Sequence, residues 1–99
     1  MQILKYTDYF QLEDWSDNFD FDKYPRLLDM RYCVGCYPIA KRTLPDMHFI
    51  QPHERMRIGL NFRTLEAAEE CFKSLTEGTK TIKDYADHAH EPRHLYCID

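Results

Sequence analysis

The sequence contains few of the residues and runs that mark several large classes of protein. Only three glycines and five prolines occur among 99 residues, which argues against a disordered chain. No apolar run approaches the roughly 20 residues of a membrane span, and the first residues lack the apolar stretch of a signal peptide. We therefore expect a cytoplasmic protein, in a reducing compartment where four cysteines are thiols or metal ligands rather than disulfides.

The local motifs of common enzyme active sites are also missing. The chain has no nucleophile elbow, phosphate-binding loop or metalloprotease motif. Its densest titratable group is His88 and His90 beside Asp84, Asp87 and Glu91, and on a helix Asp84 and His88 are neighbours. This group is either an acid–base site or, as we favour, a solvated helix end. We expect that the protein is not an enzyme.

Acidic and basic residues are segregated along the chain, although its net charge is only −4. In each of three successive segments, residues of one sign clearly outnumber those of the other. Residues 1–22 carry one Lys and six acids, residues 23–63 carry eight Lys or Arg and three acids, and residues 64–99 carry four and eight. A basic middle between acidic ends argues against nucleic-acid binding by the whole surface. It allows a local basic patch, or pairing between segments of the same chain.

What the chain does contain is enough apolar material for one small domain, residues 1–99. Hydrophobic residues make up 43% of it, and seven Tyr and six Phe supply large side chains for a core. The clearest strand pattern is the period-two alternation of residues 55–63, in which Met56, Ile58, Leu60 and Phe62 are the apolar members.

A helix is predicted directly after that strand. Thr64 is a good N-cap, and Gly78 is a plausible terminator. Apolar residues spaced by three and four form its buried face: Leu65, Ala68, Phe72 and Leu75. In residues 1–12 the spacing of apolar residues fits either a strand or a short helix, and we favour the helix. Elsewhere the patterns favour a loop in 13–25, strands in 26–34, 47–50 and 94–98, and a short helix in 82–89. The prediction is an α+β fold, a small antiparallel sheet of three to four strands packed by one or two helices.

Residues 53–70 also carry a family resemblance. The matching residues are Glu54, Arg55, Gly59, Phe62, Thr64, Ala68, Glu69 and Glu70. They resemble the pattern E-R-x-x-x-G-x-x-F-x-T-x-E-E-A-E of short accessory proteins encoded by phages and prophages, with the acidic positions slightly displaced. The resemblance implies a strand that runs into a helix. It also implies a biological setting in which many small proteins bind and disable a host machine.

The sequence Cys33-Val-Gly-Cys36 is the sharpest local motif. Two cysteines at this spacing can reach one tetrahedral Zn²⁺, and His94 and Cys97 have a compatible spacing. Cys33, Cys36, His94 and Cys97 are therefore candidate ligands of a zinc site that would gather two distant parts of the chain. The alternative is a pair of small buried thiols. A redox dithiol is less favoured, because no helix begins after Cys33 to lower its pKa.

A basic group in the middle of the chain is a candidate nucleic-acid interface. Its members are Lys41, Arg42, Arg55, Arg57 and Arg63. Such side chains bind phosphates, but no sequence motif of a nucleic-acid-binding fold accompanies them. The alternative is that they face the acidic segments of the same chain, or water.

An acidic, aromatic segment is the candidate partner-binding site. Its members are Asp14, Trp15, Asp17, Phe19, Asp20, Phe21 and Asp22. Aromatic side chains anchor protein interfaces, and carboxylates steer a basic partner. The segment lacks the glycine and the final glutamate of a calcium loop. The alternative is a loop that packs Trp15 into the core while its acids remain in water.

Our preferred hypothesis is a phage or mobile-element accessory protein that binds a host protein stoichiometrically. Inhibition of a host defence nuclease or of a CRISPR complex is its specific form, in the cytoplasm of a bacterial host. The alternative is a small nucleic-acid-binding module, stabilised by zinc. We expect no membrane partner, and the sequence leaves the oligomeric state open.

Overall fold

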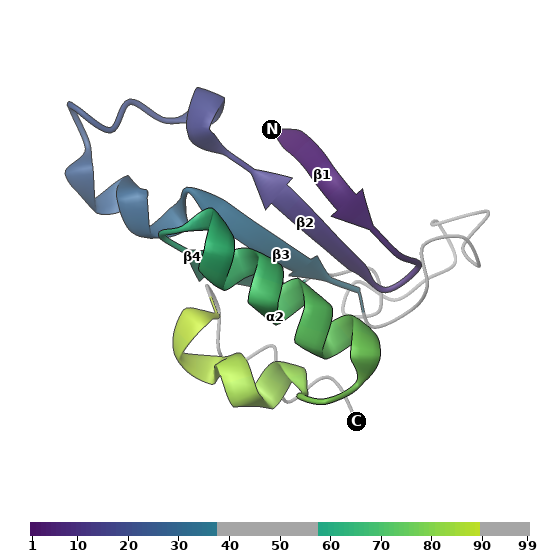
Figure 1. The fold of residues 1–99 in the computed structure, drawn as a ribbon. Coiled ribbons are helices and arrows are strands. Elements are labelled where there is room, and N and C mark those ends of the chain that lie inside the picture. The colour runs from purple at the N-terminus through teal and green to yellow at the C-terminus, as the bar shows by residue number, and fades with distance from the viewer. Residues whose placement is uncertain (38–57, 90–99) are drawn as a thin grey trace, which may run out of the picture.

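The computed structural model describes residues 1–37 and 58–89, which form an antiparallel sheet with a helix packed on one face (Figure 1). The strands are β1 (Gln2–Tyr6), β2 (Phe10–Asp14), β3 (Tyr32–Cys36) and β4 (Ile58–Phe62), and they pair in the order β1-β2-β3-β4. The described helices are α2 (Leu65–Glu77) and three short 3-10 segments: η1 (Ser16–Asn18), η2 (Pro25–Met30) and η5 (Ile82–His88). The predicted α+β fold is confirmed.

The core lies between α2 and one face of the sheet. Leu12, Val34 and Leu60 are aligned across β2, β3 and β4, and all three are fully buried. Fully burying such a side chain contributes about 1.5–3 kcal/mol. The helix covers them with Ala68, Cys71, Phe72 and Leu75. Because side chains alternate between the faces of a strand, the second face carries Glu13, Cys33 and Asn61 at the neighbouring register position.

The predicted strand-to-helix junction is confirmed for the part that the structure describes. Along β4 the buried residues alternate with partly exposed ones, as the period of two requires. The Thr64 side chain accepts a hydrogen bond from the Ala67 N–H at 3.2 Å and caps α2. Gly78 ends the helix in the left-handed region with φ of 78°, and its N–H donates to the Leu75 carbonyl.

The helix predicted in residues 1–12 is wrong, because β1 and β2 form a hairpin there. The Thr7 hydroxyl accepts the Phe10 N–H at 3.0 Å, and the Thr7 N–H donates to the Phe10 carbonyl, which closes the turn. The register shifts between Ile3 and Lys5, where β1 has one residue more than β2. This bulge interrupts the alternation of apolar residues, so the sequence did not show a strand period.

The strand predicted in residues 26–34 is only partly correct, because β3 begins at Tyr32. Residues Pro25–Met30 instead form η2, with Pro25 in its first turn. Proline sets a helical φ and removes an N–H that a first turn leaves unbonded in any case. The apolar side chains of η2 are half-buried, which explains why the segment has the composition of a strand.

The short helix predicted in residues 82–89 is present as η5, with a kink at Tyr85. Thr81 and Asp84 form a capping box at its start, and Ala89 makes an isolated bridge with Leu60 of β4. The strands predicted at 47–50 and 94–98 lie outside the described residues. No helix among the residues that the structure describes is long and apolar enough to cross a membrane.

Candidate functional site

Three aromatic side chains after β2 are in contact and form what we call the ring cluster: Trp15, Phe19 and Phe21. The rings of Trp15 and Phe19 are stacked with centroids 6.1 Å apart, and Phe19 meets Phe21 edge-on at 6.0 Å. All three side chains are half-buried, so each also presents surface to a partner. Such contacts between rings add about 0.5–1.5 kcal/mol beyond burial of their area.

The ring cluster is attached to the sheet through a buried carboxylate. The Trp15 indole Nε1 donates to Oε1 of Glu13 at 2.9 Å, and Nε2 of Gln11 donates to Oε2 at 2.6 Å. Glu13 is fully buried, and hydrogen bonds of this kind are what make a buried carboxylate tolerable. The backbone N–H of Trp15 also donates to the Arg31 carbonyl at 2.8 Å. Trp15 is therefore held by its backbone and by its ring nitrogen.

Glu13 was not among the predicted site residues. In the sequence it stands beside other acids and has the appearance of one more exposed carboxylate. The available signal was its position two residues before Trp15, which on a strand places both side chains on the same face.

Asp14 has a different role from the other aspartates of the segment. Its Oδ1 accepts hydrogen bonds from the Ser16 N–H at 2.8 Å and from the Ser16 hydroxyl at 2.5 Å. The hydroxyl bond, helped by the N–H and by the Arg31 charge, holds the pKa of Asp14 below its usual value, although desolvation opposes the shift. Arg31 Nε in turn donates to the Ser16 hydroxyl at 2.8 Å. Asp14 therefore organises the start of the segment through these hydrogen bonds.

The other three aspartates are exposed around the ring cluster, and we call Asp17, Asp20 and Asp22 the anionic fringe. Asp20 Oδ1 accepts the Lys23 N–H at 3.1 Å, and the Asp20 carbonyl accepts the Tyr24 N–H at 2.8 Å. Asp20 thus shapes the turn as well as carrying charge. Asp17 and Asp22 are exposed to solvent, and the hydrogen bonds of this turn are made by Asp20 instead.

The two cysteines of the Cys33–Cys36 motif are not brought together. Both lie within β3 and are three residues apart. Because successive side chains of a strand alternate between the two faces of the sheet, this odd spacing places the two thiols on opposite faces. Cys36 belongs to the core under α2, whereas Cys33 is aligned with Glu13 on the second face. Among residues 1–37 and 58–89, no three His, Cys, Asp or Glu side chains are grouped as metal ligands. His94 and Cys97 lie outside the described residues.

Cys71 is the third buried thiol of the described chain, on the core side of α2. Burial raises the pKa of Cys71 to about 12, with a smaller electrostatic contribution from Cys33 across the sheet. A thiol with this pKa is protonated at neutral pH and is a poor nucleophile.

Of the five basic residues considered for nucleic-acid binding, the structure describes Arg63. It is exposed just after β4, and its guanidinium lies 3.8 Å from the Asp29 carboxylate, which is also exposed. Lys41, Arg42, Arg55 and Arg57 lie outside the described residues. Arg63, the one member of this group that the structure describes, therefore pairs with an acidic residue of the same chain.

His88 and Asp84 do not form the pair that helical spacing suggested. The Asp84 carboxylate accepts the Thr81 N–H at 2.7 Å, which commits it to the capping box. The His88 ring stacks on Phe62 with centroids 4.5 Å apart, and its Nδ1 lies 3.0 Å from the Asn61 carbonyl. His88 therefore attaches η5 to β4, and His90 lies outside the described residues.

No protein-family model, curated protein or solved structure matches this chain. Function is therefore inferred from the residues and their geometry. The ring cluster with its anionic fringe is the candidate site, because it combines contacting aromatic side chains with exposed charge of one sign.

Proposed function

We propose that this protein acts by stoichiometric binding to a partner protein, with the ring cluster and the anionic fringe as its contact surface. The observation that supports this most strongly is the arrangement of Trp15, Phe19 and Phe21 in mutual contact and half-exposed, beside the exposed Asp17 and Asp22. Aromatic side chains at the centre and charge at the rim are the usual anatomy of a binding site for protein.

The attachment of the ring cluster to the sheet favours binding. A side chain that orders only on association costs about 0.5–1.5 kcal/mol. Trp15 is already held through Glu13 and Arg31, and Phe19 is stacked upon it, so less ordering remains for the bound state. Trp15 is half-buried and is not part of the core under α2, and its indole nitrogen is bonded to Glu13 of the sheet.

The sign of the fringe defines the chemistry of the partner. Carboxylates around an apolar centre are complementary to Lys and Arg around an apolar pocket, and they raise the rate of association at low salt. Proteins that handle nucleic acid have such basic surfaces. We therefore propose a host nuclease or CRISPR complex as the partner, with occupation of its basic channel as the mechanism. The resemblance of residues 53–70 to phage-encoded accessory proteins is what suggests a bacterial host.

An affinity capture with matched charge variants tests this proposal. The tagged protein is incubated with bacterial lysate, with and without nuclease treatment, and the retained proteins are identified by mass spectrometry. D17K/D22K reverses two fringe charges that have no role in the turn. D29K/D87K makes the same change in net charge at exposed aspartates elsewhere. Equal thermal melting of the two variants establishes that both remain folded.

We expect one complex to be retained by the wild type and by D29K/D87K but lost by D17K/D22K. Retention of the same complex by D17K/D22K would refute the role of the fringe. Recovery of many proteins that disappears on nuclease treatment would favour nucleic-acid binding instead.

A further inference from the structure

Strand β1 is one of the two edge strands of the described sheet, and its side chains are poorly covered. Four of its five residues are exposed. Ile3 is 49% exposed and Tyr6 is 64% exposed. These side chains lie on the face of Glu13 and Gln11, because Ile3 is aligned with Glu13 and Tyr6 with Gln11. Helix α2 packs on the other face of the sheet, over β2, β3 and β4.

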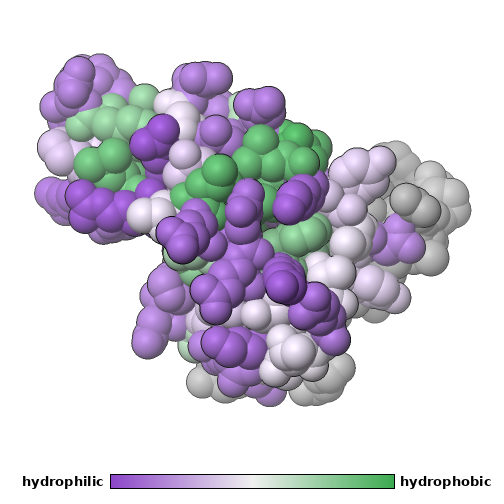
Figure 2. All heavy atoms as spheres, viewed as in Figure 1, coloured by the Kyte–Doolittle hydropathy of each residue, from purple (hydrophilic) through white to green (hydrophobic). Residues whose placement is uncertain are grey.

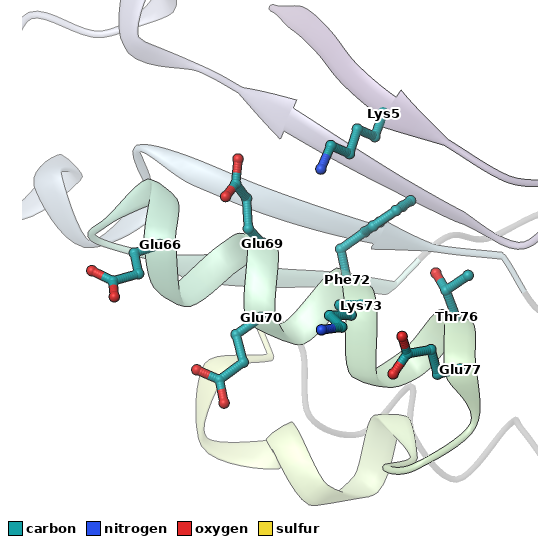
Figure 3. Close-up of a pocket in the computed structure, with 8 residues that line it drawn as sticks. All are labelled: Lys5, Glu66, Glu69, Glu70, Phe72, Lys73, Thr76 and Glu77. Carbon is teal, nitrogen blue, oxygen red and sulfur yellow. The ribbon is translucent and has the colours of Figure 1, made fainter.

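A cavity of about 500 Å³ lies on the helix side, between Lys5 of β1 and α2 (Figure 3). It is lined by Lys5, Glu66, Glu69, Glu70, Phe72, Lys73, Thr76 and Glu77. Phe72 points from α2 toward β1 and is the one apolar side chain of the lining. Glu69 points to the same side as Phe72, toward Lys5, whereas Glu70 points away from β1. Figure 2 shows a hydrophobic surface between polar side chains on this side of the molecule. Leu4 of β1 is half-buried and packs against the core.

The cavity carries more negative than positive charge, because four glutamates line it with two lysines, Lys5 and Lys73. The one ion pair closer than 4.0 Å among residues 1–37 and 58–89 is between Arg63 and Asp29, which do not line the cavity. Glu66 stands three and four residues before Glu69 and Glu70, where like charges repel. Lys73 stands four and three residues after the same two glutamates, where opposite charges attract. Glu77 lies in the last turn, where the helix dipole disfavours a negative charge, and no basic residue accompanies it there.

We propose that β1 and this cavity form a docking surface for an extended segment of a partner protein in which Lys or Arg alternates with apolar residues. A segment laid beside β1 directs alternate side chains to opposite faces. Its basic side chains would meet the glutamates and Phe72 on the helix side. Its apolar side chains would cover Ile3 and Tyr6 on the other. This surface is made of different residues from the ring cluster, so it binds independently of the proposed function.

A second copy of this chain is a poorer occupant of the same surface. Two copies paired through β1 would bring the glutamates of one α2 toward those of the other. Each cavity has four glutamates and two lysines, so the assembled surface would combine like charges. The charge of the cavity instead selects a basic segment.

Labelled synthetic peptides test the proposal directly. One peptide alternates Lys and Val, and the second has the same composition with every Lys before every Val. Binding to the full chain is followed by fluorescence anisotropy. E69K/E70K reverses two cavity charges, I3S removes the apolar side chain on the other face, and D29K/D87K is the matched charge control. D17K/D22K separates this surface from the ring cluster.

We expect the alternating peptide to bind the wild type, D29K/D87K and D17K/D22K with similar affinity. Affinity should fall about tenfold or more in E69K/E70K and in I3S, and for the block peptide. Equal affinity for the two peptides, unchanged binding by E69K/E70K, or no saturable binding at all would overturn the proposal. Sedimentation of the wild type as a dimer that I3S converts to a monomer would also overturn it in favour of a second copy. A loss of binding confined to D17K/D22K would assign the peptide to the ring cluster.

Discussion

Replacement of Trp15 by phenylalanine tests whether the buried carboxylate holds the ring cluster. The change keeps an aromatic ring beside Phe19 but removes the indole N–H that donates to Oε1 of Glu13 at 2.9 Å. Glu13 is fully buried, so water does not simply replace the lost donor. Removing the donor of a buried acceptor costs about 1–3 kcal/mol. We expect W15F to lower the free energy of unfolding by that amount, about 4–24 °C in melting temperature for a domain of this size.

A double-mutant cycle separates this bond from the smaller volume of phenylalanine. Urea unfolding of the wild type, W15F, E13Q and W15F/E13Q, followed by far-UV circular dichroism, gives the coupling energy between the two side chains. We expect a coupling of about 1 kcal/mol or more, because the residues touch directly. A coupling near zero, or a W15F variant as stable as the wild type, would show that the indole–carboxylate bond does not hold the ring cluster.

Three further predictions concern the rest of the described fold. T64A removes the cap of α2 and should cost about 1 kcal/mol in urea unfolding. Because the pKa of Asp14 is lowered in the folded protein, its stabilisation is present above the unfolded-state pKa and is lost as pH falls through the folded-state pKa. The free energy of unfolding of D14N should therefore fall less steeply than that of the wild type as the pH is lowered below about 4. Cys71, with a pKa raised to about 12, should react with a thiol reagent only after denaturant is added; rapid reaction of the folded protein would contradict its burial.

The strand-to-helix junction was predictable because its signals are local. The alternation in β4, the Thr64 cap and the Gly78 terminator each depend on neighbours within a few residues. Nothing distant has to be known for such patterns to be interpreted.

The N-terminal hairpin was not predictable, because a bulge at Ile3–Lys5 removes the period that identifies a strand. The position of Cys33 and Cys36 depends on register as well. Their spacing is the same in a zinc knuckle and in a straight strand, and only the pairing with β2 and β4 shows that they face opposite ways.

The acidic, aromatic segment was selected as a candidate site from its sequence, but the different roles of its carboxylates were not predicted. Asp14 and Asp17 have the same side chain and similar neighbours in the sequence. The hydrogen bonds from Ser16 to Asp14 depend on the turn after β2, as does the burial of Glu13 beneath Trp15.

Trp15 fluorescence tests the central claim most directly once a partner has been isolated. It is the only tryptophan of the chain. Once the fluorescence of the partner alone has been subtracted, the remaining tryptophan emission therefore reports on the ring cluster. Titration with partner should shift Trp15 emission to shorter wavelength, protect it from acrylamide quenching and reach an end point at one equivalent. Association that leaves Trp15 emission and quenching unchanged would contradict the ring cluster as the contact surface.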